Sequence, residues 1–224
     1  MKNLTAYTQS NRAEWDASAA QHEGGERWRR LMAGFAQPGF STFDDTATDL
    51  LRRAGVKGSR VVQVGWNIGG EVLSCHALGA AACWGIDISP EFLRLAERLN
   101  ERAGHPARFV HADIYALPED VPRDFDIALI TIGVVNWMPD LSAFFSALGG
   151  LLATGGRLVA YETHPFLEML EPTGATLHTP TRSYFRAQPD VLREAQVYDG
   201  SAAAAAPASY WFAYRLGDAV TASV

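Results

Sequence analysis

A glycine-punctuated stretch at residues 60–71, Arg-Val-Val-Gln-Val-Gly-Trp-Asn-Ile-Gly-Gly-Glu, is the strongest candidate for a ligand-binding loop in this sequence. A strand, a tight turn and a helix in this order place backbone N–H groups and a helix N-terminus beside a ligand. A pyrophosphate-binding turn would need glycine where this loop has Asn67, because the phosphates lie against the backbone there. Asn67 instead favours the amino-acid end of a ligand. A turn with a purely structural role is the alternative.

Two aspartates follow the next two predicted strands. Asp87 ends the stretch 82–87, where an acidic side chain can bind ribose hydroxyls. It could also cap the following helix, but Ser89 is better placed for that. Asp113 follows the strand 108–110 and could accept a hydrogen bond from an adenine amino group. Loop 65–70 and the two aspartates therefore predict a site for a nucleoside with an amino-acid tail.

Two candidates for proton transfer follow the fifth predicted strand. His164 has the side chain best suited to act as a base near neutral pH, and Glu162 lies two residues before it. A turn of the chain at His164-Pro165 is an equally good reading. No His or Cys spacing predicts a metal site, and we expect Cys75 and Cys83 to be buried, reduced residues.

The elements that must position these residues alternate between strands and helices. Residues 1–35 are helix-prone, with Trp28, Leu31 and Phe35 on one helix face, and a second helix is expected to start near Asp44 or Asp45. The regular part then predicts strands at 60–64, 82–87, 108–110, 125–131 and 157–162, with helices at 70–79, 90–103 and after Pro139-Asp140. This alternation predicts a doubly wound, Rossmann-like, mostly parallel α/β sheet with helices on both faces.

The pattern weakens after His164-Pro165. Residues 181–187 and 191–198 could pair as a hairpin, the alanine-rich segment 201–209 is expected to be a loop, and residues 210–220 have a helical pattern. The sequence has 224 residues, enough for a single domain, and 48% of them are hydrophobic.

The charge of the chain argues against some partners. The formal net charge is −6 without a long basic block, so nucleic acid is not an expected partner. No apolar run is long enough to cross a membrane, and the N-terminus lacks an apolar signal region. We therefore expect a cytoplasmic protein without a membrane partner.

The order and spacing of these motifs resemble the class I S-adenosylmethionine-dependent methyltransferases over about residues 55–165. The matching segments are 61–71, 85–90, 111–113, 125–126, 135–140 and 152–162. Asn11-Arg12-x-x-Trp15 and the segment 162–166 resemble a bacterial small-molecule branch of that superfamily.

The resemblance implies S-adenosylmethionine as the cofactor and gives roles to individual residues. Loop residues Gly65, Trp66, Asn67 and Gly69 would lie near its methionine portion, and Asp87 would bind the ribose. Ile88 would pack on the adenine, and Asp113 with Ile114 would read the adenine edge. Thr131 and Ile132 would face the sulfonium, and Arg12 and Trp15 would approach the cofactor from an N-terminal lid.

Three departures from the family pattern matter. Gln63 and Asn67 replace an acidic residue and a glycine of the first motif, and Asn136 stands where relatives often carry His. The chain also ends before the antiparallel strand pair with which the family's sheet closes, so this hairpin is expected to be missing or short. Strand five would then be an exposed edge, which a homodimer or the 181–198 hairpin could cover, or the protein could be truncated and impaired.

These observations predict a single domain of three parts: an N-terminal helical lid at 1–55, a cofactor-binding core at 56–165, and a substrate-side insertion with a C-terminal helix at 166–224. The predicted function is methyl transfer from S-adenosylmethionine to an O, N or C nucleophile of a small molecule, in secondary metabolism. The alternatives are a cofactor-binding scaffold without turnover and a nucleotide-dependent oxidoreductase, against which Asn67 argues.

Overall fold

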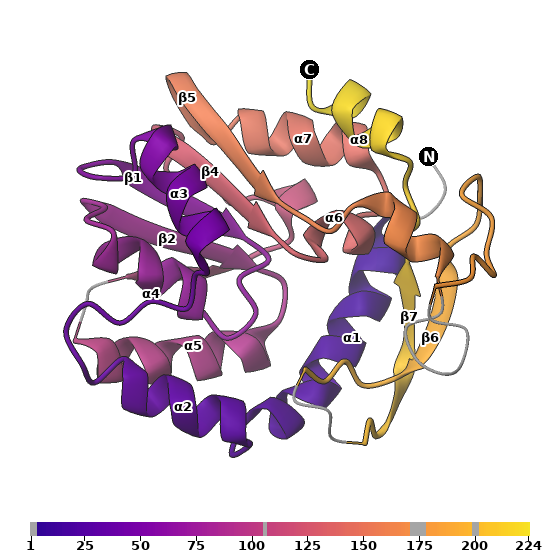
Figure 1. Ribbon diagram of the computed structural model, residues 1–224, viewed down its shortest axis with the longest axis horizontal. Coiled ribbons are helices and arrows are strands. Elements are labelled where there is room, and N and C mark those ends of the chain that lie inside the picture. Colours follow the sequence, from indigo (N-terminus) through magenta and orange to yellow (C-terminus); the bar gives the residue numbers. More distant parts are fainter. Residues whose placement is uncertain (1–3, 105–106, 171–177, 199–201) are drawn as a thin grey trace.

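Five parallel strands form the central sheet of the protein, in the order β3-β2-β1-β4-β5. The computed structural model describes residues 4–104, 107–170, 178–198 and 202–224. The strands are β1 (Arg60–Val64), β2 (Ala82–Asp87), β3 (Arg108–His111), β4 (Phe125–Thr131) and β5 (Leu152–Tyr161). Helices pack on both faces of this sheet (Figure 1). The predicted doubly wound parallel architecture is confirmed, and three of the five strands have the predicted bounds.

Alternate residues of the central strands point to opposite faces of the sheet, and each face carries a core. Val61 belongs to the core shared with α3 (Asp45–Ala54), α4 (Gly70–Ala77) and α5 (Pro90–Ala103). Val62 belongs to the core shared with α7 (Leu141–Gly149). Both valines are almost fully buried, which explains why β1 is apolar apart from Arg60 at its start and Gln63.

The helix ends follow the predicted capping residues. Asp44 accepts a hydrogen bond from Ala47 N at 2.8 Å, and Gly55 ends α3 at a φ of 86°. Ser89 caps α5 by accepting from Phe92 N at 3.2 Å, with Pro90 as the first helical residue. These caps fix where α5 begins, directly after Asp87.

Two N-terminal helices cover the carboxyl edge of the sheet. They are α1 (Leu4–His22) and α2 (Glu26–Gly34). Trp28, Leu31 and Phe35 are all buried, as their spacing on one helix face predicts. In Figure 1, α1 runs between the central sheet and the C-terminal strands, so it contacts both halves of the molecule.

The C-terminal region differs from the prediction. Strand β6 (Asp190–Glu194) pairs in antiparallel fashion with β7 (Ala205–Trp211), so the predicted hairpin of 181–187 with 191–198 is wrong. Of the segment 201–209 that was expected to be a loop, residues 205–209 belong to strand β7, and residue 201 lies outside the described residues. The helix α8 (Leu216–Ala222) begins later than the predicted 210.

The reason for the difference is a tertiary contact. Asn11 of α1 accepts a hydrogen bond from Tyr210 N at 2.7 Å, and its amide donates to Tyr210 O at 3.3 Å. These bonds give backbone groups of β7 a partner on α1, which favours extended backbone over the helix that the local sequence suggests.

Strand β5 lies at the edge of the sheet, next to β4 alone. The β6–β7 pair forms a separate two-stranded sheet that does not extend the central one. Strand β5 also starts at Leu152, earlier than the predicted 157, because the glycines at 155 and 156 are accommodated by a register shift opposite β4. Among the described residues, no antiparallel hairpin extends the main sheet.

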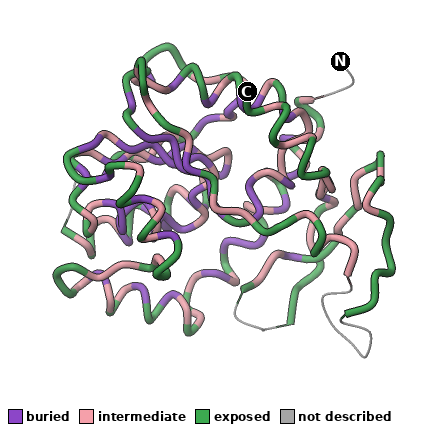
Figure 2. Tube along the Cα trace, turned by 45° about the horizontal axis from the view of Figure 1, so that its top comes forward, coloured by how far each residue is buried: buried purple, intermediate pink, exposed green. Residues whose placement is uncertain are grey.

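Burial is uneven along the chain. Strands β1 and β4 are mostly buried, whereas β3, β5 and residues 178–198 are mostly intermediate or exposed. Figure 2 shows the burial along the whole trace. Within the described part of the chain, no helix combines the length and the apolar character that crossing a membrane requires.

Glu14 of α1 is buried where that helix faces the C-terminal segment. Its Oε1 accepts a hydrogen bond from Gln196 N at 3.0 Å, while its Oε2 is buried without a hydrogen-bond partner among the described residues. Burial raises the pKa of Glu14 from 4.5 to about 7.

This burial predicts a pH-dependent stability. Folding raises the pKa of Glu14. Its contribution to the stability of the folded state is therefore fully present below about pH 4.5 and is lost as the pH rises through about 7. Urea unfolding of the protein should therefore show a free energy of unfolding that falls, by up to about 3 kcal/mol for this group, between pH 4.5 and 8. The Glu14→Gln variant should show a flatter dependence. Parallel curves for the two proteins would contradict this role of Glu14.

Candidate functional site

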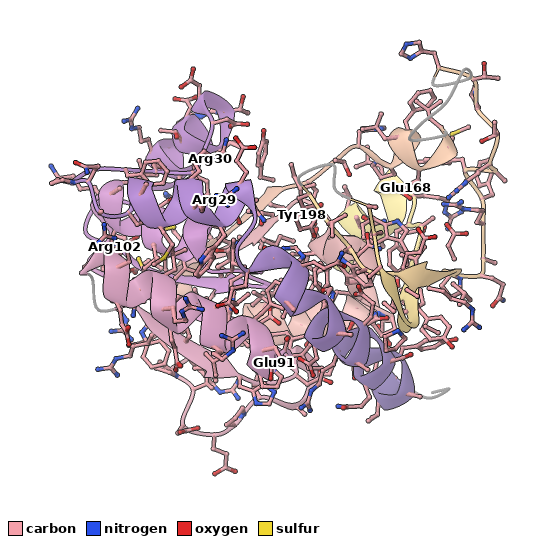
Figure 3. The ribbon with its side chains drawn as sticks, turned by 90° about the horizontal axis from the view of Figure 1, so that it is seen from below. Arg29, Arg30, Glu91, Arg102, Glu168 and Tyr198 are labelled. Atoms are coloured by element: carbon pink, nitrogen blue, oxygen red, sulfur yellow. The ribbon has the colours of Figure 1, made fainter. Side chains whose placement is uncertain are left out.

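A cavity of about 370 Å³ lies at the carboxyl ends of the parallel strands. The loops after β1, β2, β3 and β4 line it from the sheet, and α1 and α2 line it from the other side. Tyr198, from the segment after β6, also lines the cavity. Figure 3 shows where this residue lies relative to Arg29 and Arg30 of α2. Three segments far apart in the sequence thus meet around one space.

The glycine-punctuated loop has backbone conformations that its residue types allow. Gly65 has a φ of 69°, and a Cβ there would lie 2.9 Å from a methyl group of Val134. Asn67 has a φ of 56°, which asparagine tolerates better than most residues. Gly69 is the N-cap of α4 with a φ of 81°. Gly65 and Asn67 line the cavity, whereas Gly69 shapes the turn beneath it.

Asp87 lines the cavity at the end of β2. Its Oδ1 accepts a hydrogen bond from Ser89 N at 3.0 Å, and Ser89 Oγ donates to Asp16 of α1 at 2.6 Å. Burial raises the pKa of Asp87 to about 6, although backbone N–H groups of its loop oppose the shift. The carboxylate is therefore charged at neutral pH and can accept hydrogen bonds from a pair of hydroxyl groups.

Beyond Asp87, towards the end of β3, the wall of the cavity is apolar with one polar edge. Ile88, Asp113 and Ile114 all line it, as do Ile86 and Phe92 behind them. Asp113 Oδ1 accepts a hydrogen bond from Tyr115 N at 3.0 Å, which fixes the start of the short helix η1 (Ile114–Ala116). A flat heterocycle with a polar edge would match this combination of apolar walls and a carboxylate.

A hydrogen-bonded group of three side chains lies beneath the loop. Gln63 Nε2 donates to Glu71 Oε2 at 2.5 Å and to Thr131 Oγ1 at 3.2 Å. Thr131 Oγ1 in turn donates to the same Glu71 Oε2 at 2.7 Å. Thr131 and Glu71 line the cavity, and the next residue, Ile132, lines it with 60% of its surface exposed.

The lid side of the cavity is aromatic and basic. Trp15 of α1 contacts Trp137 edge-on, with ring centroids 5.2 Å apart, and both line the cavity. Arg27 Nη1 donates to Asn67 Oδ1 at 3.2 Å, and the guanidinium lies 5.3 Å from the centre of the Tyr198 ring. The predicted lid residue Trp15 therefore lies at the cavity. Arg12 does not line it and pairs with Asp16 at 3.3 Å.

Trp66 borders the cavity, but its ring has a structural position. The side chain is 2% exposed and packs edge-on against Phe109, with ring centroids 4.9 Å apart. A Cβ on Gly85 would lie 2.3 Å from this ring, so the glycine leaves room for it. The indole ring of Trp66 therefore packs in the core, so its face is not available for the cofactor contact predicted from the sequence.

The two candidate proton-transfer residues lie outside the cavity lining. His164 is exposed, and its Nδ1 accepts a hydrogen bond from Phe166 N at 3.1 Å at the start of η2 (Pro165–Met169). Glu162 accepts from Gly133 N at 2.6 Å and Val135 N at 3.0 Å, and burial raises its pKa. Glu162 therefore positions the loop after β4 and α6 (Val134–Trp137).

Several residues at the cavity were not predicted from the sequence: Thr8, Asn11, Arg27, Arg30, Thr42, Glu71, Tyr115, Trp137, Met138 and Tyr198. Glu71 could have been found from the sequence, because it is the acidic residue in the first turn of the helix that follows the loop. No sequence pattern places Arg27 or Tyr198 at the cavity, because only tertiary folding brings them to the loop. Asn136 is buried beside this region and donates to Phe212 O at 2.7 Å, which is a structural role.

No group of three or more His, Cys, Asp or Glu side chains that could hold a metal ion occurs among the residues that the structure describes. Cys75 and Cys83 are buried free thiols.

A family model described as a methyltransferase domain matches residues 62–158. This match covers the strands β1 to β4, most of β5 and the loops that line the sheet side of the cavity.

Two curated proteins are similar to parts of the chain. A malonyl-acyl-carrier-protein O-methyltransferase of Prosthecochloris aestuarii is 29% identical over 109 residues, which is 46% of this chain and 40% of that protein. A demethylmenaquinone methyltransferase of Thermus thermophilus is 38% identical over 81 residues, 36% of each chain. The chain thus matches well under half of the length of these relatives.

Two solved structures share the fold over most of the chain. An S-adenosylmethionine-dependent methyltransferase from Clostridium acetobutylicum aligns with a TM-score of 0.58 at 14% identity, covering 91% of this chain and 86% of that one. One from Mesorhizobium loti aligns with a TM-score of 0.50 at 22% identity, covering 80% of each. At these identities the likeness concerns the fold alone.

Proposed function

We propose that this chain, whose residues 62–158 match a methyltransferase-domain model, is a class I S-adenosylmethionine-dependent methyltransferase that transfers a methyl group to an O, N or C nucleophile of a small molecule. The observation that carries the proposal is the cavity at the carboxyl ends of β1 to β4, with Asp87 beside a loop that has Asn67 in place of a glycine. The curated relative from Thermus thermophilus, named a demethylmenaquinone methyltransferase, supports a small acceptor.

The residues of the cavity fit S-adenosylmethionine. Asp87 would accept the hydrogen bonds of the ribose hydroxyls, Ile88 would pack on the adenine, and Asp113 would accept from its amino group. A Cβ on Gly65 would meet a methyl group of Val134 at 2.9 Å, so a glycine is needed here for the loop to pack against α6. When bound, S-adenosylmethionine supplies a methyl group on a sulfonium, which is already a strong electrophile.

The chain's own contribution would then be alignment of the acceptor and exclusion of water. Thr131 and Ile132 would border the reacting methyl group, with Trp15 and Trp137 closing the cavity from the lid. None of the described residues that line the cavity is His, Cys or Lys. We therefore propose an acceptor that is nucleophilic at neutral pH without a histidine base.

We also propose that the chain has the three functional parts predicted from the sequence. Residues 1–55 would act as the lid, because Trp15 and Arg27 line the cavity. Residues 56–165 would bind the cofactor, and residues 166–224 would form the acceptor side, since Tyr198 reaches the cavity from this part. A cytoplasmic location, a role in secondary metabolism and a homodimer over the β5 edge are further, secondary proposals.

The proposal can be tested with S-adenosylmethionine that carries a labelled methyl group. The protein would be incubated with a panel of phenols, quinols, amines and carboxylic acids, and the label in each small molecule would be measured. We expect time-dependent labelling of at least one acceptor, and loss of this labelling in the Asp87→Ala variant. Binding of S-adenosylhomocysteine without labelling of any acceptor would instead favour the scaffold alternative.

His164→Ala is expected to change the rate of methyl transfer by less than about threefold, because His164 caps η2 and does not line the cavity. Removing a general base would lower the rate by a factor of about 10²–10⁴. The rate at saturating acceptor, measured for both proteins at the same pH, distinguishes the two roles. A loss of more than a hundredfold would restore His164 as the base.

A further inference from the structure

The backbone of Gln196 is held between two side chains of α1. Gln196 N donates to Glu14 Oε1 at 3.0 Å, and Gln196 O lies 2.7 Å from His22 Nε2. A carbonyl oxygen can only accept a hydrogen bond, so the imidazole donates in the second contact. Glu14 and His22 are both buried, so little water competes for either bond. Both backbone polar groups of this residue, which follows β6, are thus fixed to α1.

Helix α1 is in turn attached to the central part of the fold. Asp16 Oδ1 accepts a hydrogen bond from Ser89 Oγ at 2.6 Å, at the start of α5. Glu23 Oε2 pairs with Arg94 Nη2 of the same helix at 2.8 Å. The two contacts lie about two turns apart along α1, so this helix is a fixed support for the segment that follows β6.

Tyr198 lies two residues beyond Gln196, at the cavity (labelled in Figure 3). Its ring centroid lies 5.5 Å from that of His22 and 6.5 Å from that of Trp15, both on α1. The guanidinium of Arg27, on α2, lies 5.3 Å from the same ring. Tyr198 therefore contacts both lid helices. It is also 57% exposed, so its ring has surface that a ligand in the cavity could cover.

A second pair of bonds joins α1 to residues 202–204 and is exposed. Gln21 Nε2 donates to Ala202 O at 3.3 Å, and Ala204 N donates to Gln21 Oε1 at 3.4 Å. These bonds are long, and water competes for both of their partners. The shorter, more buried bonds to Gln196 therefore contribute more to holding the chain near Tyr198 against α1.

We propose that Glu14 and His22 are positioning residues that hold the segment 195–198 against α1, so that Tyr198 closes the cavity over a bound ligand and slows its release. Neither Glu14 nor His22 lines the cavity, so both act through Tyr198. The segment after β6 thus joins the two N-terminal helices as a third part of the lid, and its opening limits ligand release. This inference rests on the proposed function for the identity of the ligand that tests it.

The first test measures how fast S-adenosylhomocysteine leaves the protein, by stopped-flow fluorescence of the tryptophans. Trp15 and Trp137 line the cavity and report on its occupancy. Glu14→Met removes the acceptor for Gln196 N and should raise the dissociation rate by about tenfold. Glu14→Gln keeps an acceptor oxygen at the same place, so its rate should stay within about twofold of the unmutated protein. Equal rates for all three proteins would overturn the proposal.

A double variant shows whether Glu14 acts through Tyr198. Tyr198 is exposed, so Tyr198→Ala is expected to keep the fold, and it should raise the dissociation rate by about tenfold on its own. Adding Glu14→Met to Tyr198→Ala should raise the rate by no more than a further factor of about two, because the two residues share one route. Effects that multiply would overturn the proposal, since Glu14 would then act independently of Tyr198.

Gln21→Met is the matched control, because it also removes side-chain bonds from α1 to the chain between β6 and β7. It should leave the dissociation rate within about twofold of the unmutated protein. A rise as large as that of Glu14→Met would overturn the special role of Gln196. Thermal unfolding of each variant would be recorded first, so that a folding defect is not read as an open lid.

Hydrogen exchange of backbone amides, followed by NMR on the free protein, tests the attachment without a ligand. The amide of Gln196 should exchange at least about tenfold faster in Glu14→Met than in the unmutated protein. The amide of Tyr210, which Asn11 holds, should keep its rate. Equal exchange of Gln196 in both proteins would overturn the attachment. If the unmutated protein bound no S-adenosylhomocysteine, the proposed function would fail, and this exchange would still decide whether Glu14 holds the segment.

Discussion

Replacing Asp87 with alanine is expected to weaken the binding of S-adenosylhomocysteine by roughly a hundredfold, because two charge-assisted hydrogen bonds to ribose hydroxyls are lost. Asp87 is the carboxylate at the end of β2, and its loop is fixed by Ser89, which caps α5 and bonds to Asp16 of the lid. Calorimetric titration at pH 7.5 measures the effect, since the pKa of Asp87, raised to about 6, leaves it charged there.

The control for this prediction is Asp126→Ala. Asp126 also bonds a backbone N–H, that of Arg60 at 2.8 Å, but it does not line the cavity. This variant should bind S-adenosylhomocysteine as the unmutated protein does. A loss of less than about threefold in Asp87→Ala would show that the ribose lies elsewhere.

Replacing Trp66 with alanine is expected to lower the free energy of unfolding by about 3–5 kcal/mol. The ring of Trp66 is among the largest fully buried side chains, and it packs between Gly85 and Phe109. Its removal leaves a cavity under the cofactor loop. The midpoint of thermal unfolding should fall by about 10 °C for a chain of this size.

Trp66→Phe is the matched variant. The indole Nε1 of Trp66 is buried and has no hydrogen-bond partner among the described residues, so phenylalanine removes no hydrogen bond. This variant should lose less than half of the stability that the alanine variant loses. If Trp66→Ala kept its unfolding midpoint and lost only cofactor affinity, the ring would be a cofactor contact instead of a core residue.

The strands β1 and β4 could be predicted because they are buried on both faces. Residues 127–130 are continuously apolar, and the predicted bounds 125–131 match β4. The C-terminal strand β7 could not be predicted in the same way. Its alanine-rich sequence has no strand pattern, and its backbone is held by Asn11 of α1, about two hundred residues earlier in the chain. Such a contact leaves no local signal.

The residues of the site also divide into those with a local sequence signal and those that only tertiary folding brings to the cavity. Asp87 and Asp113 could be found because each directly follows a predicted strand, and parallel strands bring their carboxyl ends to one edge. Trp66 was assigned to the cofactor by its place in the loop, but its side chain points into the core. Arg27 lies on a predicted helix and Tyr198 in a segment without regular patterning, and the folded chain alone brings them to Asn67 and the cavity.

Binding of S-adenosylmethionine in the cavity at the carboxyl ends of β1 to β4 can be measured by calorimetric titration of the unmutated protein with S-adenosylhomocysteine, and in parallel with NAD⁺. We expect one saturable site for S-adenosylhomocysteine per chain and no heat of binding for NAD⁺, because Asn67 stands where a pyrophosphate would approach the backbone. Binding of NAD⁺, or no binding of S-adenosylhomocysteine at millimolar concentration, would contradict this expectation.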